Sequence, residues 1–175
     1  MYQEIFQIKQ NNCYNLDDFV QSSSNQAKYE VIIECPESVW GVKPYENALL
    51  IKGPRSSGKT FLTKLWLDIC YKKKIKGYVI EDIDKVYDEK ELIHQFNMIT
   101  ESRHWLLMTC TIDMAYDLPD LHSRVSSLNK LILEKPDDQL LYSYIFKIFS
   151  NYSINISTGI IDYLIKILTR DLHLI

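Results

Sequence analysis

The chain has 175 residues, of which 46% are hydrophobic and 25% are charged, and its formal net charge is −3. This length fits one compact domain with a small appendage, and the composition is that of an ordinary soluble globular protein. No apolar run reaches the roughly 18 residues of a membrane span, and the first residues lack the basic start and apolar core of a signal peptide. The negative charge argues against strong direct DNA binding. The four isolated cysteines and four scattered histidines fit reduced thiols in the cytoplasm better than a zinc site.

Hydrophobic periodicity predicts alternating helices and strands along the chain. Strands are predicted over residues 48–52, 78–80, 105–109 and 131–133. Helices are predicted over residues 27–35, from the end of the octet at 53–60 to about 71, after Asp88, from Pro136 onwards and over 159–168. The alternation predicts an α/β fold, in which a mostly parallel sheet lies between two helical layers. A break near residues 134–138 separates this part from two helices that could form a lid.

The octet at residues 53–60 reads Gly-Pro-Arg-Ser-Ser-Gly-Lys-Thr and lies between a predicted strand and a predicted helix. Backbone N–H groups of such a loop cradle phosphate oxygens, the lysine adds a positive charge on the outer phosphates, and the threonine hydroxyl ligates Mg²⁺. We therefore expect ADP or ATP, with Mg²⁺ at Thr60. The expected nucleotide contacts are Gly53, Pro54, Arg55, Ser56, Ser57, Gly58, Lys59, Thr60 and Phe61.

Two acids end the next strand, where a phosphate loop needs carboxylates for the metal and the attacking water. Glu81 is expected in the metal shell, and Asp82 is expected to orient the water. Alternatively, both acids are solvated turn residues. Thr111, or failing that Thr109, could sense the terminal phosphate at the end of the third strand. A purely structural threonine is the alternative there.

Residues 118–124 read Leu-Pro-Asp-Leu-His-Ser-Arg and place an arginine on a short helix before the last strand. Oligomeric ATPases offer such an arginine to a neighbour's γ-phosphate, because its guanidinium stabilises charge that develops in phosphoryl transfer. Arg124 is therefore a candidate arginine finger. The alternative is a surface arginine paired with Asp120 or Asp117.

Taken in order, these segments resemble the DnaA-related AAA+ family, and most closely its regulatory, alphaproteobacterial Hda type. The resemblance covers most of the chain. It is carried by residues 16–20 (N-terminal linker), 53–60 (Walker A), 79–84 (Walker B), 106–109 (sensor 1), 118–124 (the arginine-finger box) and 136–138 (the start of the lid). It implies a P-loop AAA+ fold with a small, truncated helical lid, since the chain stops at Ile175. Sensor 2 would fall near Arg170 or His173.

The departures from the initiator favour the regulator. Between residues 71 and 77 there is no room for the initiator's extra strand and helix, and no helix-turn-helix domain follows the lid. Hda-like proteins dock on the replication sliding clamp through an N-terminal peptide, which Gln3, Phe6 and Ile8 resemble in part. A merely amphipathic start of the chain is the alternative for these three residues.

The resemblance therefore implies a clamp-binding tail over 1–15, an AAA+ domain over 16–134 and a partial lid over 135–175. Together with the clamp, the protein would stimulate ATP hydrolysis by the initiator DnaA through Arg124, and so limit re-initiation. Its own ATPase would be weak or absent, and association of copies of the chain stays open. Two alternatives remain: a self-sufficient ATPase of the helicase-loader type that acts on DNA, and a degenerate remnant that does not hydrolyse nucleotide.

Overall fold

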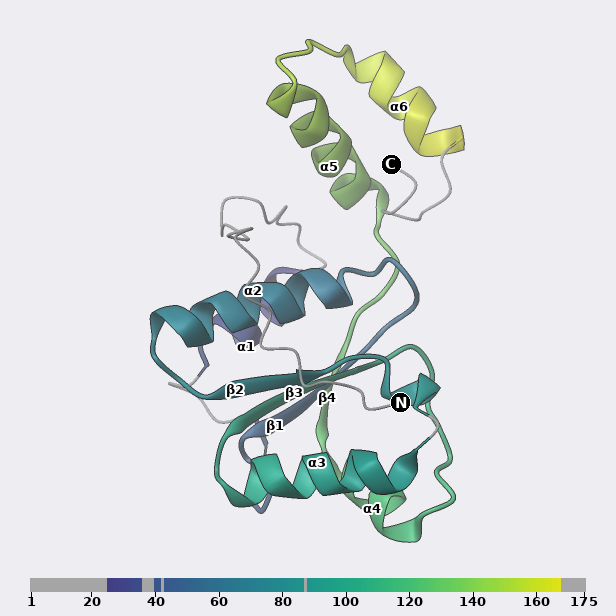
Figure 1. Ribbon diagram of the computed structural model, residues 1–175. Coiled ribbons are helices and arrows are strands. Elements are labelled where there is room, and N and C mark those ends of the chain that lie inside the picture. Colours follow the sequence, from purple (N-terminus) through teal and green to yellow (C-terminus); the bar gives the residue numbers. More distant parts are fainter. Residues whose placement is uncertain (1–24, 36–39, 42, 87, 168–175) are drawn as a thin grey trace.

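A parallel sheet forms the centre of the molecule. The computed structural model describes residues 25–35, 40–41, 43–86 and 88–167. Its strands are β1 (Ala48–Lys52), β2 (Gly77–Ile80), β3 (Trp105–Cys110) and β4 (Asn129–Ile132). They are ordered β2-β3-β1-β4, and every neighbouring pair is parallel (Figure 1). The strand that precedes the octet, β1, therefore lies inside the sheet.

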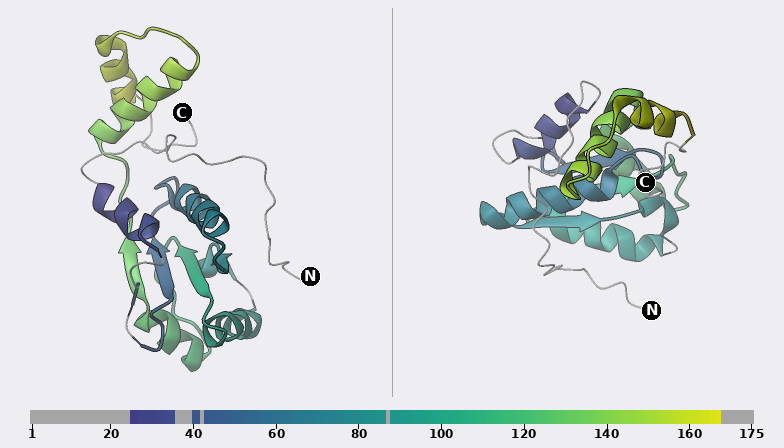
Figure 2. Two further views of the ribbon diagram at one scale, coloured as in Figure 1. Left: turned by 90° about the vertical axis from the view of Figure 1, so that its left-hand side faces the viewer. Right: turned by 90° about the horizontal axis from the view of Figure 1, so that it is seen from above.

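Helices cover both faces of this sheet. Helices α1 (Gln26–Ile33) and α2 (Lys59–Lys72) lie on one face, and α3 (Glu89–Glu101) and α4 (Pro119–Ser127) lie on the other (Figure 1). Helices α5 (Asp138–Asn151) and α6 (Thr158–Ile167) pack on each other beyond the carboxyl ends of the strands (Figure 2). The predicted α/β fold with three αβα layers is confirmed.

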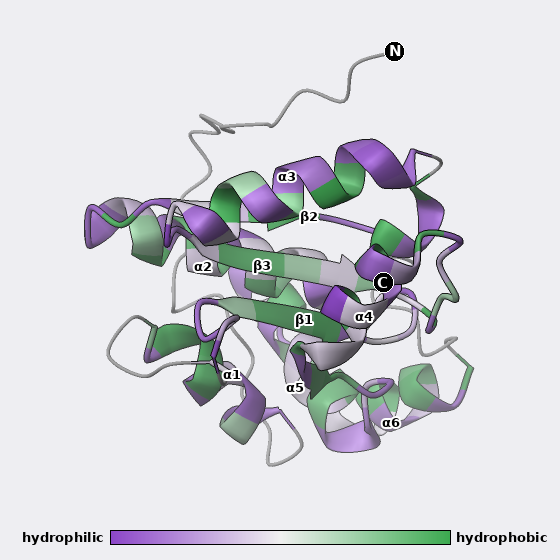
Figure 3. Ribbon diagram, turned by 90° about the horizontal axis from the view of Figure 1, so that it is seen from below, coloured by the Kyte–Doolittle hydropathy of each residue, from purple (hydrophilic) through white to green (hydrophobic). Residues whose placement is uncertain are grey.

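The core consists of two clusters, because alternate residues of each strand face opposite helical layers. Leu49 and Ile51 join Trp66 of α2 in one cluster, whereas Leu50 joins Phe96 of α3 in the other. The first four residues of β1 are buried, as expected for a strand covered on both faces. Figure 3 shows the hydrophobic strands β1 and β3 beside α3, whose outer surface is polar.

The connection between α2 and β2 consists of residues 73–76 alone, and β2 forms one edge of the sheet. The other edge, β4, starts two residues earlier than predicted. Asn129 and Lys130 pair with Leu49 and Leu50 of β1, but both are exposed. They therefore lack the hydrophobic signal on which a sequence-based prediction of a strand depends.

Local capping explains where two of the helices start. The Asp88 side chain accepts hydrogen bonds from the Lys90 and Glu91 N–H groups at the start of α3, as predicted. Asp137 does the same for the Leu140 N–H of α5. In the part of the chain described above, no helix has both the length and the apolar character needed to cross a membrane.

Candidate functional site: a phosphate loop beneath a basic cleft

The octet forms a tight loop between β1 and α2. Glycine is required at two of its positions, for a different reason at each. A Cβ on Gly53 would lie 2.9 Å from the Leu133 carbonyl oxygen and 2.6 Å from Ser57 Oγ, so a side chain has no room there. Gly58 has open space around it, but its φ of +92° belongs to the left-handed region. The Gly53 N–H donates to the Cys110 carbonyl at 3.1 Å, which ties the loop to the end of β3.

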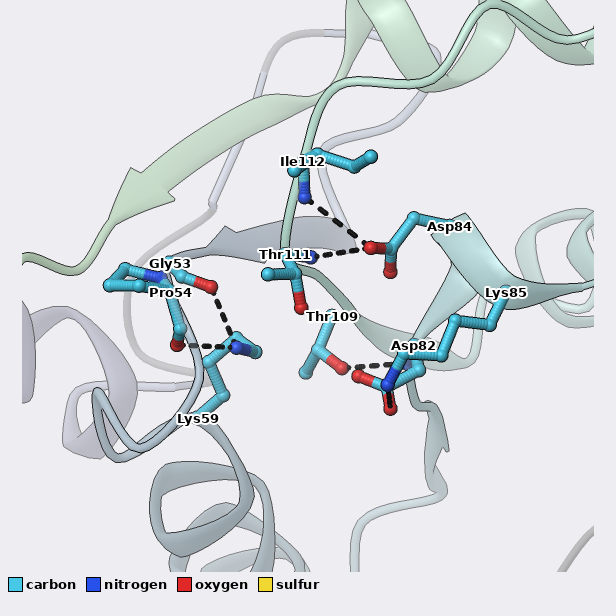
Figure 4. A network of polar contacts seen from close by, with 9 residues as sticks. All are labelled: Gly53, Pro54, Lys59, Asp82, Asp84, Lys85, Thr109, Thr111 and Ile112. Atoms are coloured by element: carbon cyan, nitrogen blue, oxygen red, sulfur yellow. Dashed lines mark hydrogen bonds and ion pairs between the residues drawn. The ribbon is translucent and has the colours of Figure 1, made fainter. Parts of the chain in front are cut away.

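Lys59 is the first residue of α2 and is only 8% exposed. Its ammonium donates to the Gly53 and Pro54 carbonyls at 2.7 and 2.8 Å, so the side chain folds back across the loop (Figure 4). Burial lowers the pKa of Lys59, whereas the negative charges of Asp82 and Asp84 act against this shift. A buried cation at a helix N-terminus is a strong attractant for an anion.

The two predicted acids after β2 point in different directions. The exposed Glu81 carboxylate lies 2.9 Å from the Thr63 hydroxyl of α2. Asp82 instead lines the cleft beside the loop, and its carboxylate pairs with Lys85 at 2.5 Å. Its φ of 52° is left-handed, a conformation that aspartate tolerates better than most residues, and its N–H donates to Thr109 Oγ1 at 2.9 Å.

The turn after β3 is held by Asp84, an acid of the predicted Walker B segment to which the sequence-based prediction assigned no role. Asp84 Oδ2 accepts hydrogen bonds from the N–H groups of Thr111 at 3.1 Å and Ile112 at 3.4 Å. This contact fixes the turn in which the Thr111 hydroxyl points between Lys59 and Asp82 (Figure 4). Thr109 Oγ1 instead accepts a hydrogen bond from the Asp82 N–H. Of the two candidate sensors, Thr111 is the one that lines the cleft.

A cleft of about 770 Å³ opens above the loop, bounded by α2, the start of α1, the segment after β4 and α5. Seven of the described residues that line it are cationic: Lys28, Arg55, Lys59, Lys64, Lys85, Lys135 and Lys147. Two carboxylates, Asp82 and Glu134, lie among the described residues of its wall. The whole chain is negative at −3, so this concentration of positive charge is local. Such a surface attracts an anionic ligand.

Most of the predicted nucleotide contacts line this cleft. They are Arg55, Ser56, Ser57, Gly58, Lys59, Thr60 and Phe61. Gly53 and Pro54 lie behind them and hold Lys59.

The cleft residues fit a phosphate group better than they fit the predicted metal shell. Ser57 Oγ is buried and has no hydrogen-bond partner among the residues that the structure describes, so it can donate to a phosphate oxygen. Thr60 and Asp82 line the cleft and could hold Mg²⁺ on a bound phosphate, whereas Glu81 is hydrogen-bonded elsewhere. Five of the described lysines that line the cleft were not predicted, and Lys85 is one of them. The sequence signal for Lys85 was a cation three residues after Asp82.

Arg124 lies on α4 and does not line the cleft. Its Nε and Nη2 groups donate to the two carboxylate oxygens of Asp120 at 3.0 and 3.1 Å, and Nη1 donates to the Tyr45 hydroxyl at 3.1 Å. The hydrogen bond to Asp120 is the largest cause that raises the pKa of Arg124. The pairing with Asp120, one of the two alternatives for this arginine, is therefore present.

Five other predicted site residues lie outside the described residues. They are Gln3, Phe6 and Ile8 of the predicted clamp peptide and Arg170 and His173 of the predicted sensor 2. Their roles stay predictions.

The fold and the loop together define a three-layer α/β domain with a phosphate loop between β1 and α2. No family model and no curated protein matches the chain. Among solved structures, its fold matches the AAA+ domain of the replication initiator DnaA. Domain III of DnaA from Thermotoga maritima has a TM-score of 0.74 at 17% identity, over 93% of this chain and 84% of that chain.

Two longer structures give the same result. DnaA from Aquifex aeolicus bound to AMPPCP has a TM-score of 0.72 at 17% identity, over 91% of this chain. A DNA replication initiation factor has a TM-score of 0.77 at 18% identity, over 93% of this chain. The chain spans 62% of the length of each of these two proteins. At such identities the match establishes the fold alone.

Proposed function

We propose that this protein binds a nucleoside di- or triphosphate in the basic cleft. The observation that carries the proposal is the phosphate loop with its buried Lys59, set in a wall of seven cations on a chain of net negative charge. A bound phosphate would replace the Gly53 and Pro54 carbonyls as the partner of the Lys59 ammonium. Helices α5 and α6 would act as a lid, since Leu140, Tyr144 and Ile148 of α5 line the cleft.

The DnaA structures support this proposal, since two of them contain the ATP analogue AMPPCP. We expect ADP or ATP as the ligand, with Mg²⁺ held on the phosphates by Thr60 and Asp82. Hydrolysis by this chain alone is expected to be slow. Glu81 accepts a hydrogen bond from Thr63 and does not line the cleft, and Asp82 is assigned to the Mg²⁺, so neither carboxylate is left to orient a water molecule.

We further propose that the protein regulates replication initiation by presenting Arg124 to the ATP of a DnaA-type initiator. Because Arg124 lies away from the cleft of its own chain, it is suited to act on a partner's nucleotide. Asp120 and Tyr45 hold the guanidinium, and its side chain keeps 27% of its surface exposed. Docking on the sliding clamp through Gln3, Phe6 and Ile8 belongs to the same proposal.

Two measurements test these proposals separately. Calorimetric titration with ADP and ATP in the presence of Mg²⁺ should show binding to the native chain and none to Lys59→Ala. Failure of the native chain to bind either nucleotide would contradict nucleotide binding. Arg124→Ala should bind nucleotide normally but lose the stimulation of initiator ATPase in the presence of the clamp. Ser123→Ala, at the exposed neighbouring position of α4, is the matched control. Stimulation that survives in Arg124→Ala would rule out the finger.

A further inference from the structure

Lys85 reaches the cleft from the side opposite the phosphate loop. It ends the short 3₁₀ turn Ile83–Lys85, which follows β2 and is anchored by the buried Ile83. The Lys85 N–H donates to the Asp82 carbonyl at 2.8 Å, which closes the turn. From there its side chain extends toward the loop, so the ammonium groups of Lys59 and Lys85 face the same space from two sides (Figure 4).

Among the described residues, the acid that forms an ion pair with Lys85 is Asp82, and it holds Lys85 weakly. The ammonium lies 2.5 Å from Asp82 Oδ2, but the two side chains are 61% and 43% exposed. Exposed ion pairs of this kind contribute little to stability, because both charges are well solvated. A stronger anion can therefore displace Asp82 from Lys85 without a large loss.

Three cations converge on this part of the cleft. Burial is the main cause that lowers the pKa of Lys59, and the positive charge of Lys85 acts in the same direction. The hydrogen bond with Asp82 raises the pKa of Lys85, and the charge of Arg55 opposes that shift. Lys85 thus repels both Lys59 and Arg55, and an anion of more than one negative charge bound among these side chains relieves the repulsion.

We propose that Lys85 binds the terminal phosphate of a nucleoside triphosphate and thereby distinguishes it from a diphosphate. This inference rests on the proposed nucleotide binding. Lys59 reaches the outer phosphates from the phosphate loop, whereas Lys85 approaches them from the strand ends where Asp82 and Thr111 lie. A terminal phosphate carries more charge and more acceptor oxygens than the carboxylate of Asp82, so it takes over the ammonium. When the terminal phosphate binds Lys85, Asp82 is released from this ion pair.

The test compares the affinities for AMPPCP and ADP, both with Mg²⁺, by calorimetric titration. Lys85→Ala should weaken AMPPCP binding about tenfold but ADP binding less than about twofold. A tenfold loss corresponds to the loss of one hydrogen bond to a charged group. Lys85→Arg should retain most of the preference for AMPPCP. Lys90→Ala, an exposed lysine at the start of α3 that does not line the cleft, is the matched control. Equal effects of Lys85→Ala on both nucleotides, or no effect, would overturn the inference.

A second pair of variants excludes an indirect effect through Asp82. Removing Lys85 leaves the Asp82 carboxylate without its partner, and this carboxylate would itself repel a triphosphate. In an Asp82→Asn background that repulsion is gone. In that background Lys85→Ala should still weaken AMPPCP binding about tenfold. If the effect disappeared, the role of Lys85 would be only to neutralise Asp82. If the native chain binds neither nucleotide, both the proposed function and this inference are overturned. If it binds both, the Lys85 variants test this inference alone.

Discussion

Gly58 is the residue at which the phosphate loop depends most directly on backbone conformation. Its φ of +92° lets the chain turn into the first residue of α2, where Lys59 sits. A Cβ at Gly58 would meet nothing within 4 Å, so the restriction is conformational and not one of space. Gly53 is the reverse case, because its close neighbours are Ser57 and the backbone of Leu133.

Replacing Gly58 by alanine should therefore lower the free energy of unfolding by about 1–2 kcal/mol, the cost of a left-handed non-glycine residue. Urea unfolding monitored by circular dichroism measures it. Gly159 in α6 is the control, since it also has open space around its Cβ position but carries no left-handed φ. Gly159→Ala should leave stability unchanged or raise it by up to about 1 kcal/mol. Equal losses in the two variants would contradict the conformational explanation.

Among the elements, α3 shows how local capping and packing act together. Leu92, Phe96 and Ile99 are buried against the sheet, and the other face of the helix is polar. Asp88 fixes the first turn by accepting from two backbone N–H groups, each at 3.0 Å. Glu89, in the same turn, accepts from the N–H groups of residues 117 and 118, so α3 also positions the segment that leads into α4.

Asp88→Ala should reduce the free energy of unfolding by about 1 kcal/mol, because two N–H groups of the first turn lose their acceptor. Asp88→Asn keeps a side-chain oxygen at the same position and should lose much less. Urea unfolding of the three proteins provides the comparison. The capping role would be refuted if the asparagine variant were as unstable as the alanine variant.

For the whole molecule, stability is linked to pH through groups in both core clusters. Burial raises the pKa of Cys70 to about 12, that of Cys110 to about 11 and that of Tyr116 to about 12. Cys70 belongs to the cluster under α2, whereas Cys110 and Tyr116 belong to the cluster under α3. Thiols of the unfolded chain release their protons near pH 9, while the folded thiols keep theirs.

These groups therefore make their full contribution to the free energy of unfolding below about pH 8, and this contribution decreases as the pH rises toward 11. Between pH 8 and pH 10 the free energy of unfolding should fall by about 3 kcal/mol, because each of the two thiols contributes about 1.4 kcal/mol over one pH unit. Urea unfolding at the two pH values measures this change. In the double variant Cys70→Ala/Cys110→Ala the free energy of unfolding should fall clearly less between these pH values. If it falls as much as in the native chain, other groups cause the effect.

Much of the fold follows from local sequence signals. The apolar run 48–52, the octet and the helical spacing after it predict β1, the phosphate loop and α2, because each signal spans only a few neighbouring residues. The pairing of Arg124 with Asp120 is also local, since residues four apart meet on one helix face. Where the signal was weak, at the exposed Asn129 and Lys130, the boundary of β4 was predicted too late.

The sequence by itself thus determined the layered α/β architecture and the residues of the phosphate loop, since both depend on short-range periodicity and on glycines at fixed spacing. Only the tertiary structure decided how the charged groups around the loop are paired. It joined Glu81 to Thr63, Asp84 to the backbone of Thr111 and Tyr45 to Arg124, which are 18, 27 and 79 residues apart. It also brought Lys85 opposite Lys59. The physical reason is that the packing of distant strand ends, and not the neighbours along the chain, determines which charges meet across the cleft.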